Sequence, residues 1–192
     1  MIISEFESLT ESSGYSLQGS FTHDLTTSKV WLLQQVSKVV DQVDTVYVLG
    51  SWFGNTSLFM TLQPEFDYNK IVNVEVNANM LKQSQRMLNH VGANDVQHML
   101  RDANKLDYRQ LGKNGLVINT SLNDMPGRAW FDNIPTGTLV VMQARDQTQE
   151  RPFHRINDIL KLYPLSQVLY KGSLDLQDPE TDYTRFMVIG RK

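Results

Sequence analysis

Two glycines lie directly after a short apolar stretch, in the order Gly50-Ser51-Trp52-Phe53-Gly54. The stretch before them, TVYVL, has the β-branched composition of a buried strand. Glycines in a strand-to-helix turn allow backbone N–H groups to approach a ligand, and the N-terminus of the following helix carries a partial positive charge. The same glycines also suit an ordinary turn. This segment by itself leaves both a binding loop and a plain connection open.

An acidic residue, Glu75, lies at the end of the next apolar strand, IVNVEV, 21 residues after Gly54. In nucleotide-binding α/β folds, an acidic side chain about 20 residues beyond the glycine turn accepts hydrogen bonds from a ribose diol. An ionised carboxylate in an apolar strand is costly without a partner, and the hydroxyl pair of a ligand supplies one. The alternative is a glutamate that faces solvent at the end of its strand.

A third polar segment, Arg101-Asp102-Ala103-Asn104, follows the strand-like residues VQHML. A carboxylate at this place can accept a hydrogen bond from the exocyclic amine of an adenine, and Asp102 can equally cap the helix that follows. The carboxyl ends of parallel strands meet at one edge of a sheet, where ligands bind. Taken together, the three segments indicate a site for a nucleoside.

The elements that must position these residues alternate between strand and helix. This alternation indicates a mostly parallel sheet with helices on both faces. The connection over 171–182 has no helical stripe, so we expect the last strand to run antiparallel to the strand before it. Helices are expected over 27–43, 55–62, 78–91, 105–111 and 153–163, and strands over 45–49, 71–76, 96–100, 116–119, 137–143, 166–170 and 183–189.

The motifs VYVLGSWFGN, VNVEVN, VQHMLRDANKLD and GLVINTS occur in this order within residues 45–190. They resemble motif I, the post-I acidic residue, motif II and motif IV of the class I S-adenosylmethionine-dependent methyltransferases. The resemblance implies a Rossmann-like α/β fold, with a seven-stranded, mostly parallel sheet and an antiparallel last strand. It also implies S-adenosylmethionine as cofactor and methyl transfer as reaction. By this resemblance the methionine moiety is lined by Gly50, Ser51 and Gly54, the ribose hydroxyls are held by Glu75, and the adenine is contacted by Asp102 and Ala103.

We accordingly divide the chain into an N-terminal arm and helix over 1–44 and a Rossmann-like cofactor-binding domain over 45–192, folded as one compact unit. The segments GSWFGN and INTS…IPTGTLVV also resemble uncharacterised methyltransferase-like proteins of tailed bacteriophages. If that second resemblance holds, the protein acts in the cytoplasm of the phage host.

Trp52 departs from the family pattern, because it stands where G-x-G-x-G has its middle glycine. Its side chain either turns outward or stacks over the cofactor, and we count it among the cofactor-binding residues. The alternative is that it blocks the site, which would make the chain a catalytically silent binding or assembly protein with the same fold. A nicotinamide-dependent redox enzyme would share the glycines and Glu75 but would have a parallel last strand. Transfer of another part of the cofactor also stays open.

The acceptor side is represented by the segment NTSLNDM after the fourth strand, with Asn119 and Asp124 as the candidate catalytic residues. Asn119 can orient an acceptor through its amide, and Asp124 can accept a proton. Asp124 is alternatively a loop carboxylate without a role in catalysis. The resemblance implies that His23 and Asp24, just before the first expected helix, form part of a lid over the acceptor, because N-terminal arms commonly cover this sheet edge in that family. The segment matches neither D-P-P-Y nor N-P-P-F, which disfavours methylation of a DNA base.

Composition excludes several classes of chemistry and of binding partner. The 192 residues carry a formal net charge of −3 and no cysteine. The absence of cysteine excludes disulfides, thiolate metal sites and a cysteine nucleophile, and the four histidines show no metal-ligand spacing, so we expect no metal. The acidic balance does not indicate nucleic acid as a partner. We expect a cytoplasmic enzyme without a membrane segment, acting on a small or unidentified methyl acceptor, and the oligomeric state stays open.

Overall fold

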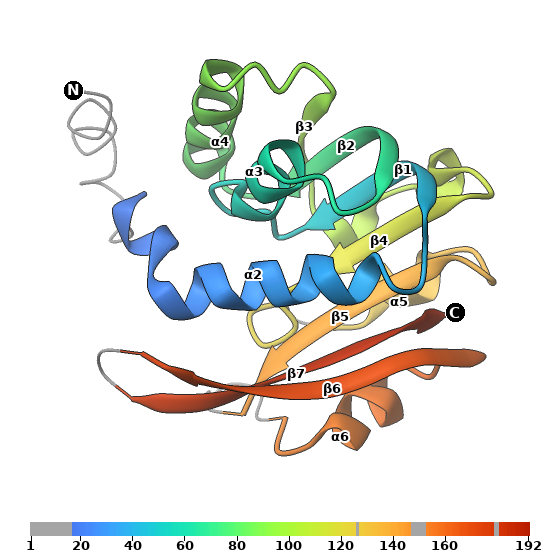
Figure 1. The fold of residues 1–192 in the computed structure, drawn as a ribbon. Helices are drawn as coiled ribbons and strands as arrows, with labels where there is room; N and C mark the ends of the chain where they lie inside the picture. The colour runs from blue at the N-terminus through green and yellow to red at the C-terminus, as the bar shows by residue number, and fades with distance from the viewer. Residues whose placement is uncertain (1–16, 126, 147–152, 179–180) are drawn as a thin grey trace.

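The computed structural model describes residues 17–125, 127–146, 153–178 and 181–192. A seven-stranded sheet runs through this part of the chain, with helices on both of its faces (Figure 1). The strand order is β3-β2-β1-β4-β5-β7-β6. The strands are β1 Gln42–Leu49, β2 Asp67–Glu75, β3 Val96–Leu100, β4 Gly115–Asn119, β5 Leu139–Arg145, β6 Gln167–Gln177 and β7 Asp182–Arg191.

Strands β1 to β5 are parallel where they pair, and β7 runs antiparallel to both of its neighbours, β5 and β6. This arrangement confirms the predicted Rossmann-like sheet with an antiparallel last strand. It is not the arrangement expected of a nicotinamide-dependent redox enzyme, for which the last strand would be parallel.

Helices form one layer on each side of the sheet. The helices α2, α3 and α4 cover one face, whereas α5, α6 and the 3₁₀ turns η2 and η3 cover the other. Their bounds are α2 His23–Val36, α3 Asn55–Leu62, α4 Ala78–His90, α5 Ala129–Asn133 and α6 Ile156–Leu162, with η1 Gln18–Phe21, η2 Ala103–Lys105 and η3 Tyr108–Leu111.

Each face of the sheet has its own apolar core. On one face, Leu32, Leu33 and Val36 of α2 pack against apolar side chains of β1, β4, β5 and β7. On the other face, α5, α6 and the turns after β3 form an apolar cluster with the sheet. In this cluster the ring centroids of Trp130 and Tyr163 lie 5.1 Å apart. Two separate cores thus hold the central strands, whose ends carry the candidate site, between layers of helices.

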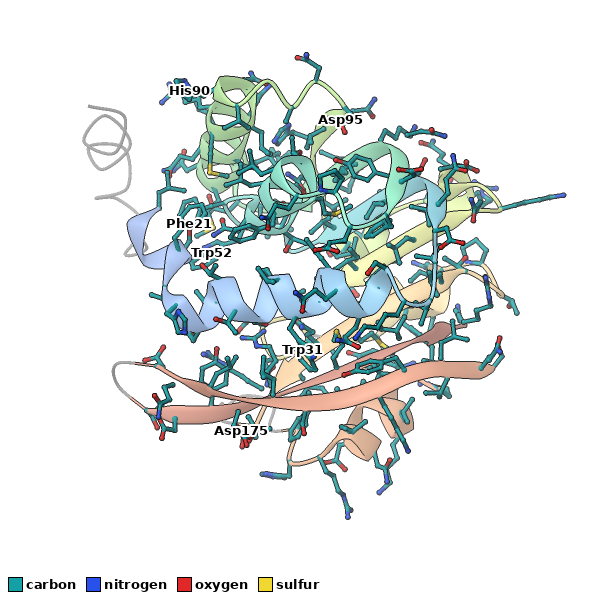
Figure 2. The ribbon with its side chains drawn as sticks, in the orientation of Figure 1. Phe21, Trp31, Trp52, His90, Asp95 and Asp175 are labelled. Atoms are coloured by element: carbon teal, nitrogen blue, oxygen red, sulfur yellow. The ribbon has the colours of Figure 1, made fainter. Side chains whose placement is uncertain are left out.

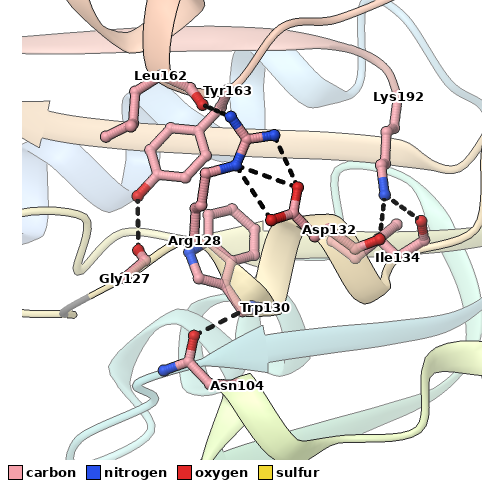
Figure 3. Close-up of polar contacts among 9 residues, drawn as sticks. All are labelled: Asn104, Gly127, Arg128, Trp130, Asp132, Ile134, Leu162, Tyr163 and Lys192. Atoms are coloured by element: carbon pink, nitrogen blue, oxygen red, sulfur yellow. Dashed lines mark hydrogen bonds and ion pairs between the residues drawn. The ribbon is translucent and has the colours of Figure 1, made fainter.

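Polar contacts join α5 to the segment that follows β3 (Figure 3). The Asn104 Oδ1 atom accepts a hydrogen bond of 3.0 Å from the backbone N–H of Trp130. Arg128 forms an ion pair of 2.7 Å with Asp132 and donates a bond of 3.0 Å to the carbonyl of Leu162. These contacts fix the residues after β3 against α5 and α6.

Helix α2 spans His23–Val36, whereas the sequence predicts a helix over 27–43. The prediction starts too late because Asp24 interrupts the apolar periodicity, although the fold buries this side chain. It ends too late because Val43 is a buried residue of β1 rather than the last apolar residue of a helix.

The N-terminal arm is described only from residue 17 onward, and residues 1–16 lie outside the described residues. In η1, the backbone carbonyl of Ser20 accepts a hydrogen bond of 2.5 Å from the Asn55 side chain at the start of α3. The rings of Phe21 and Phe59 are in edge contact, with centroids 6.3 Å apart. The end of the arm therefore packs beside the helix that follows the glycine loop.

Strand β6 is longer than predicted, because it continues from Gln167 to Gln177 and pairs with β7 along that length. The sequence predicts a connection over 171–182. Most of the side chains over 171–177 are exposed or half-buried, so they show no apolar run. The single helix expected over 105–111 is likewise replaced by η2 and η3, whose first N–H groups are capped by Asp102 and Asp107.

Gly54 allows α3 to pack closely against its neighbours. Its φ is +78°, and an added Cβ would lie 3.1 Å from Asn73 Nδ2, 3.2 Å from Leu88 Cδ1 and in collision with Ser84 Oγ. These three side chains belong to β2 and α4. Gly54 is therefore required both by its left-handed backbone and by close packing.

We expect Gly54→Ala to lower the free energy of unfolding by about 2 to 4 kcal/mol, from backbone strain and overpacking together. Gly92→Ala is the matched control, because Gly92 has φ +75° and an added Cβ there would meet nothing within 4 Å. The control should cost only about 1 kcal/mol. Urea unfolding of both variants measures the difference, and equal losses would contradict the packing role.

Candidate functional site

The glycine loop turns sharply after β1. Gly50, Trp52 and Gly54 all have left-handed backbone conformations, with φ of +57°, +53° and +78°. The Ser51 N–H donates to the carbonyl of Val74 in β2, at 3.1 Å, and the Gly54 N–H donates to the carbonyl of Ser51, at 2.8 Å. These bonds hold the loop close to β2, at the carboxyl end of the sheet.

The hydroxyl of Ser51 is buried and has no hydrogen-bond partner among the described residues. A buried hydroxyl without a partner costs about 1 to 3 kcal/mol. Orphaned polar atoms of this kind occur where a ligand supplies the missing partner. Ser51 is therefore an observation within the predicted loop that favours a bound polar molecule.

Trp52 takes the backbone conformation that a glycine would take at this position. For a residue with a Cβ, the left-handed region costs about 1 to 2 kcal/mol. The N–H of Trp52 donates a hydrogen bond of 2.9 Å to Oε2 of Glu75. The side chain of Trp52 is half-buried, and its ring centroid lies 4.9 Å from that of Phe53. The loop thus keeps the backbone path of the glycine motif in spite of the larger side chain.

Glu75 lies beside the glycine loop and is only 8% exposed. Its Oε1 atom accepts hydrogen bonds from the N–H groups of Val76 and Asn77, each at 2.9 Å, and its Oε2 atom accepts the bond from Trp52. The alternative of a solvent-facing glutamate is therefore wrong. A carboxylate has about four acceptor positions, so three backbone donors leave room for one more.

Apolar side chains flank this carboxylate. Val76 is 68% exposed and Leu100 is 56% exposed, and Leu100 is paired with Glu75 in the register of β2 and β3. Large apolar residues exposed at adjacent strand ends form a surface on which a flat ring can lie. Neither residue belongs to a recognisable motif: Val76 directly follows the buried end of β2, and Leu100 is the last residue of β3, whose side chains are half-buried or exposed.

Asp102 and Ala103 lie at the adjacent strand end. The Asp102 Oδ1 atom caps η2 by accepting hydrogen bonds from the backbone N–H and the side-chain amide of Asn104, at 2.9 and 3.2 Å. The side chain of Asp102 is half-buried, and Ala103 is buried. The expected capping role of Asp102 is therefore present, and its predicted contact with adenine stays a prediction.

The loop after β4 packs against the glycine loop. The hydroxyl of Ser121 donates to the carbonyl of Gly50 at 3.3 Å. Asn119 is fully buried, with its Oδ1 atom accepting from the N–H of Ser121 at 2.9 Å and its amide nitrogen 3.5 Å from Met125 Sδ. Asp124 is exposed. Asn119 thus shapes the loop, while Asp124 lies at the surface.

A polar cluster that the sequence pattern does not indicate lies under the first half of α2. Tyr183 donates a hydrogen bond of 2.6 Å to Oδ2 of the buried Asp24. Ser28, one turn further along α2, donates to Gln143 of β5 at 3.3 Å. Asp24 is therefore part of a buried helix face and not of an arm before the helix, and only its position one turn before Ser28 could have indicated this.

Lys29 belongs to the same cluster. Its ammonium group donates a hydrogen bond of 3.0 Å to Thr120, the residue between Asn119 and Ser121. Burial and the positive charge of Arg185 lower the pKa of Lys29 to about 7, and the carboxylate of Asp24 opposes this shift. A lysine that exchanges its proton near neutral pH therefore lies one residue away from the contact with the glycine loop.

Asp24 and Tyr183 titrate away from their ordinary ranges in opposite directions. Burial raises the pKa of Asp24, but hydrogen bonds from Thr22 and Tyr183 outweigh this effect and leave the pKa lowered. Burial raises the pKa of Tyr183; the positive charge of Arg185 opposes this shift, and the hydrogen bond to Asp24 adds to it. At neutral pH the pair is therefore a phenol that donates to a carboxylate.

A separate groove of about 660 Å³ lies between α2 and the β6–β7 hairpin. Its lining includes His23 and Thr27 of α2 and three carboxylates, Asp146, Asp175 and Asp182. In the view of Figure 2, Asp175 and Trp52 lie on opposite sides of α2. The groove is therefore a feature distinct from the glycine loop.

Comparisons with known proteins give a likeness of fold. No family model matches the sequence, and no curated protein matches it significantly. The N-methyltransferase NodS from Bradyrhizobium japonicum, solved with S-adenosyl-L-homocysteine, superposes with a TM-score of 0.67 at 15% identity, covering 96% of this chain and 97% of NodS.

Two further solved structures agree with this likeness. The N-terminal domain of EvdMO1 with S-adenosylhomocysteine bound gives a TM-score of 0.61 at 12% identity, covering 98% of this chain and 96% of that domain. The magnesium protoporphyrin IX methyltransferase from Synechocystis, with S-adenosylmethionine bound, gives 0.58 at 15% identity, covering 85% and 76%. The chain therefore has the fold of the class I S-adenosylmethionine-dependent methyltransferases.

The described part of the chain shows two further absences. No helix in it is long and apolar enough to cross a membrane. Among the same residues, no group of three or more histidine, aspartate or glutamate side chains could hold a metal ion.

We expect Lys29 to make stability depend on pH. Its pKa is about 7 in the folded chain and ordinarily 10.5, so the unfolded chain binds more protons between these values and the free energy of unfolding rises with pH across that window. Lys29→Met removes this contribution. The free energy of unfolding of the variant should therefore exceed that of the native chain most near pH 7, and this difference should shrink toward pH 10.5.

Urea unfolding of both proteins across this pH range measures the effect. Lys38→Met is the matched control, because Lys38 is an exposed lysine just after the same helix. A constant difference between the native chain and Lys29→Met would contradict the assignment.

Proposed function

We propose that this chain is an S-adenosylmethionine-dependent methyltransferase that acts on a small or unidentified acceptor. The observation that carries the proposal is the buried carboxylate of Glu75, which three backbone N–H groups hold beside the glycine loop. The methyltransferase fold supports it. The bound S-adenosylhomocysteine of NodS and of the EvdMO1 domain supports it as well.

The residues around the loop fit a nucleoside cofactor. Ser51 offers an unpartnered buried hydroxyl, and Glu75 keeps one acceptor position for a ribose hydroxyl. The exposed side chains of Val76 and Leu100 offer apolar surface to an adenine, and Asp102 offers a carboxylate to its exocyclic amine. When bound, the cofactor supplies a methyl group on a positively charged sulfur.

On the acceptor side, Lys29 is better placed to accept a proton than the predicted Asp124. A general base works best when its pKa is near the working pH, and the pKa of Lys29 is about 7. Its contact with Thr120 places it beside the loop that touches Gly50, whereas Asp124 is exposed. Methyl transfer also proceeds largely by positioning, which Asn119 supports by shaping this loop.

The proposal also covers the reaction class and the cellular compartment. The activity would be a methyl transfer of the EC 2.1.1 type in the cytoplasm. A nucleic acid is not indicated as the acceptor, because the chain has no excess of basic residues for holding one.

Calorimetry with S-adenosylhomocysteine tests the cofactor site. We expect the native chain to bind it and Glu75→Gln to bind at least about 10-fold more weakly, because the amide replaces one acceptor oxygen with a donor. Glu65→Gln is the matched control, since Glu65 is exposed in the segment before β2, and its affinity should equal that of the native chain. Absence of heat and of a thermal shift at millimolar ligand would contradict the proposal.

The second candidate function is a catalytically silent protein that binds or assembles without the cofactor. The observation that favours it is Trp52, whose N–H already bonds to Glu75 and whose large side chain replaces a glycine of the motif.

Trp52→Gly separates the two candidates. The native loop already has the glycine conformation, so we expect the variant to bind S-adenosylhomocysteine within about threefold of the native chain. Binding is measured by calorimetry, with Trp31→Phe as a control for loss of an indole away from the loop. If only Trp52→Gly bound the ligand, the silent alternative would replace the enzyme.

A further inference from the structure

We propose that the surface between the first half of α2 and the ends of β5 and β7 binds a carboxylate, so that the methyl acceptor is a small molecule bearing a carboxylate. Calling the bound molecule the methyl acceptor rests on the proposed function. The anion site itself rests on side chains that the methyltransferase proposal does not use.

Arg185, near the start of β7, is the central residue of this anion site. It is only 5% exposed, and its Nε atom is buried without a hydrogen-bond partner among the described residues. Its guanidinium lies over the ring of Tyr183, with the charged carbon 5.5 Å from the ring centre. A buried guanidinium that lacks a carboxylate is costly, so a bound anion would relieve a real deficit.

A second arginine lies opposite the first. Arg145, at the end of β5, is the register partner of Arg185 across the antiparallel pair. Side chains alternate along a strand, so Arg145 is on the same face as Gln143, which contacts α2. Like charges placed directly opposite each other destabilise a sheet. Two arginines in this register therefore indicate a requirement other than folding.

Carboxylates lie near Arg185, but those of Asp24 and Asp146 are bonded to other groups. Asp24 accepts from Tyr183, and Asp146, which lines the groove with Asp175 and Asp182, accepts the N–H of Thr184 at 3.0 Å. Neither Asp24 nor Asp146 forms an ion pair with Arg145 or Arg185 within the described residues. A bound carboxylate would therefore supply a partner that these two residues do not.

The unpartnered atom of Arg185 favours a carboxylate as its ligand. The side chains of Thr22 and Asp24 hydrogen-bond to each other, so they do not require a further partner. The buried Nε–H of Arg185 has no acceptor among the described residues. Guanidinium and carboxylate groups pair through two parallel hydrogen bonds, which suits a carboxylate better than a spherical anion.

The place of this surface connects it to the cofactor loop. Arg185 is close enough to Lys29 to lower its pKa, and Lys29 donates to Thr120. The next residue, Ser121, donates to the carbonyl of Gly50. A molecule whose carboxylate lies at Arg185 would therefore have its other end near the loops that follow β1 and β4.

Acetate is the probe for this site, and the ionisation of Lys29 reports on it. A negative charge nearby favours the charged form of a lysine, so acetate should raise the pKa of Lys29 by about one or more. Lysine labelled with carbon-13 at Cε, titrated by NMR at constant ionic strength, measures this value, and Lys29→Arg identifies the signal. Inorganic phosphate is titrated in parallel.

Arg185→Gln should abolish the effect of acetate, and Arg145→Gln should reduce it, which keeps the test informative if the first variant does not fold. Arg191→Gln is the matched control, since Arg191 ends the same strand and donates to the carbonyl of Gly137. No response of Lys29 to acetate, or an equal response in Arg185→Gln, would overturn the anion site. A response to phosphate and not to acetate would overturn the carboxylate assignment.

The titration needs neither the cofactor nor methyl transfer, so the two proposals fail separately. Binding of S-adenosylhomocysteine without any response to acetate would overturn only the carboxylate site. A response to acetate in a chain that does not bind S-adenosylhomocysteine would confirm the anion site and overturn the proposed function.

Discussion

The carboxylate of Glu75 joins the parts on which the candidate cofactor site depends. Its two oxygens bind N–H groups from the glycine loop and from the start of the segment leading into α4. Asn77, which receives one of these bonds with its N–H, is also the N-cap of α4 and accepts from the N–H groups of Asn79 and Met80. A negative charge at this position is favoured by the positive end of the helix. The loop and the helix therefore share one electrostatic anchor.

The two halves of helix α2 have different surroundings. Its second half is apolar and packs on the sheet through Leu32, Leu33 and Val36. Its first half carries the buried Asp24 and the half-buried Lys29, on the side proposed for the acceptor. Burying charged groups costs free energy that an all-apolar helix would not lose. That cost at one end of an otherwise ordinary helix is why we place the acceptor there.

The fold by itself leaves the function open, because one fold carries many activities. What distinguishes this chain is the combination at the carboxyl ends of its strands. An orphaned hydroxyl and a buried carboxylate lie beside the glycine loop, and the buried guanidinium of Arg185, whose Nε atom lacks a partner among the described residues, lies near a lysine of lowered pKa. These buried polar groups are unfavourable for folding by themselves. A nucleoside cofactor would account for those at the glycine loop, and an anionic acceptor would account for those near Lys29.

The sequence by itself determined the features that depend on local pattern. The alternation of elements predicted the sheet, the helix-free ending predicted the antiparallel last strand, and the bounds of 55–62 and 96–100 agree with α3 and β3. Only the tertiary structure decided where α2 begins, because the partners of Asp24 and Ser28 lie 159 and 115 residues away in the chain. It likewise decided that Asn119 is buried and that Arg145 faces Arg185. Burial and pairing of polar groups depend on neighbours from distant strands, which no local periodicity contains.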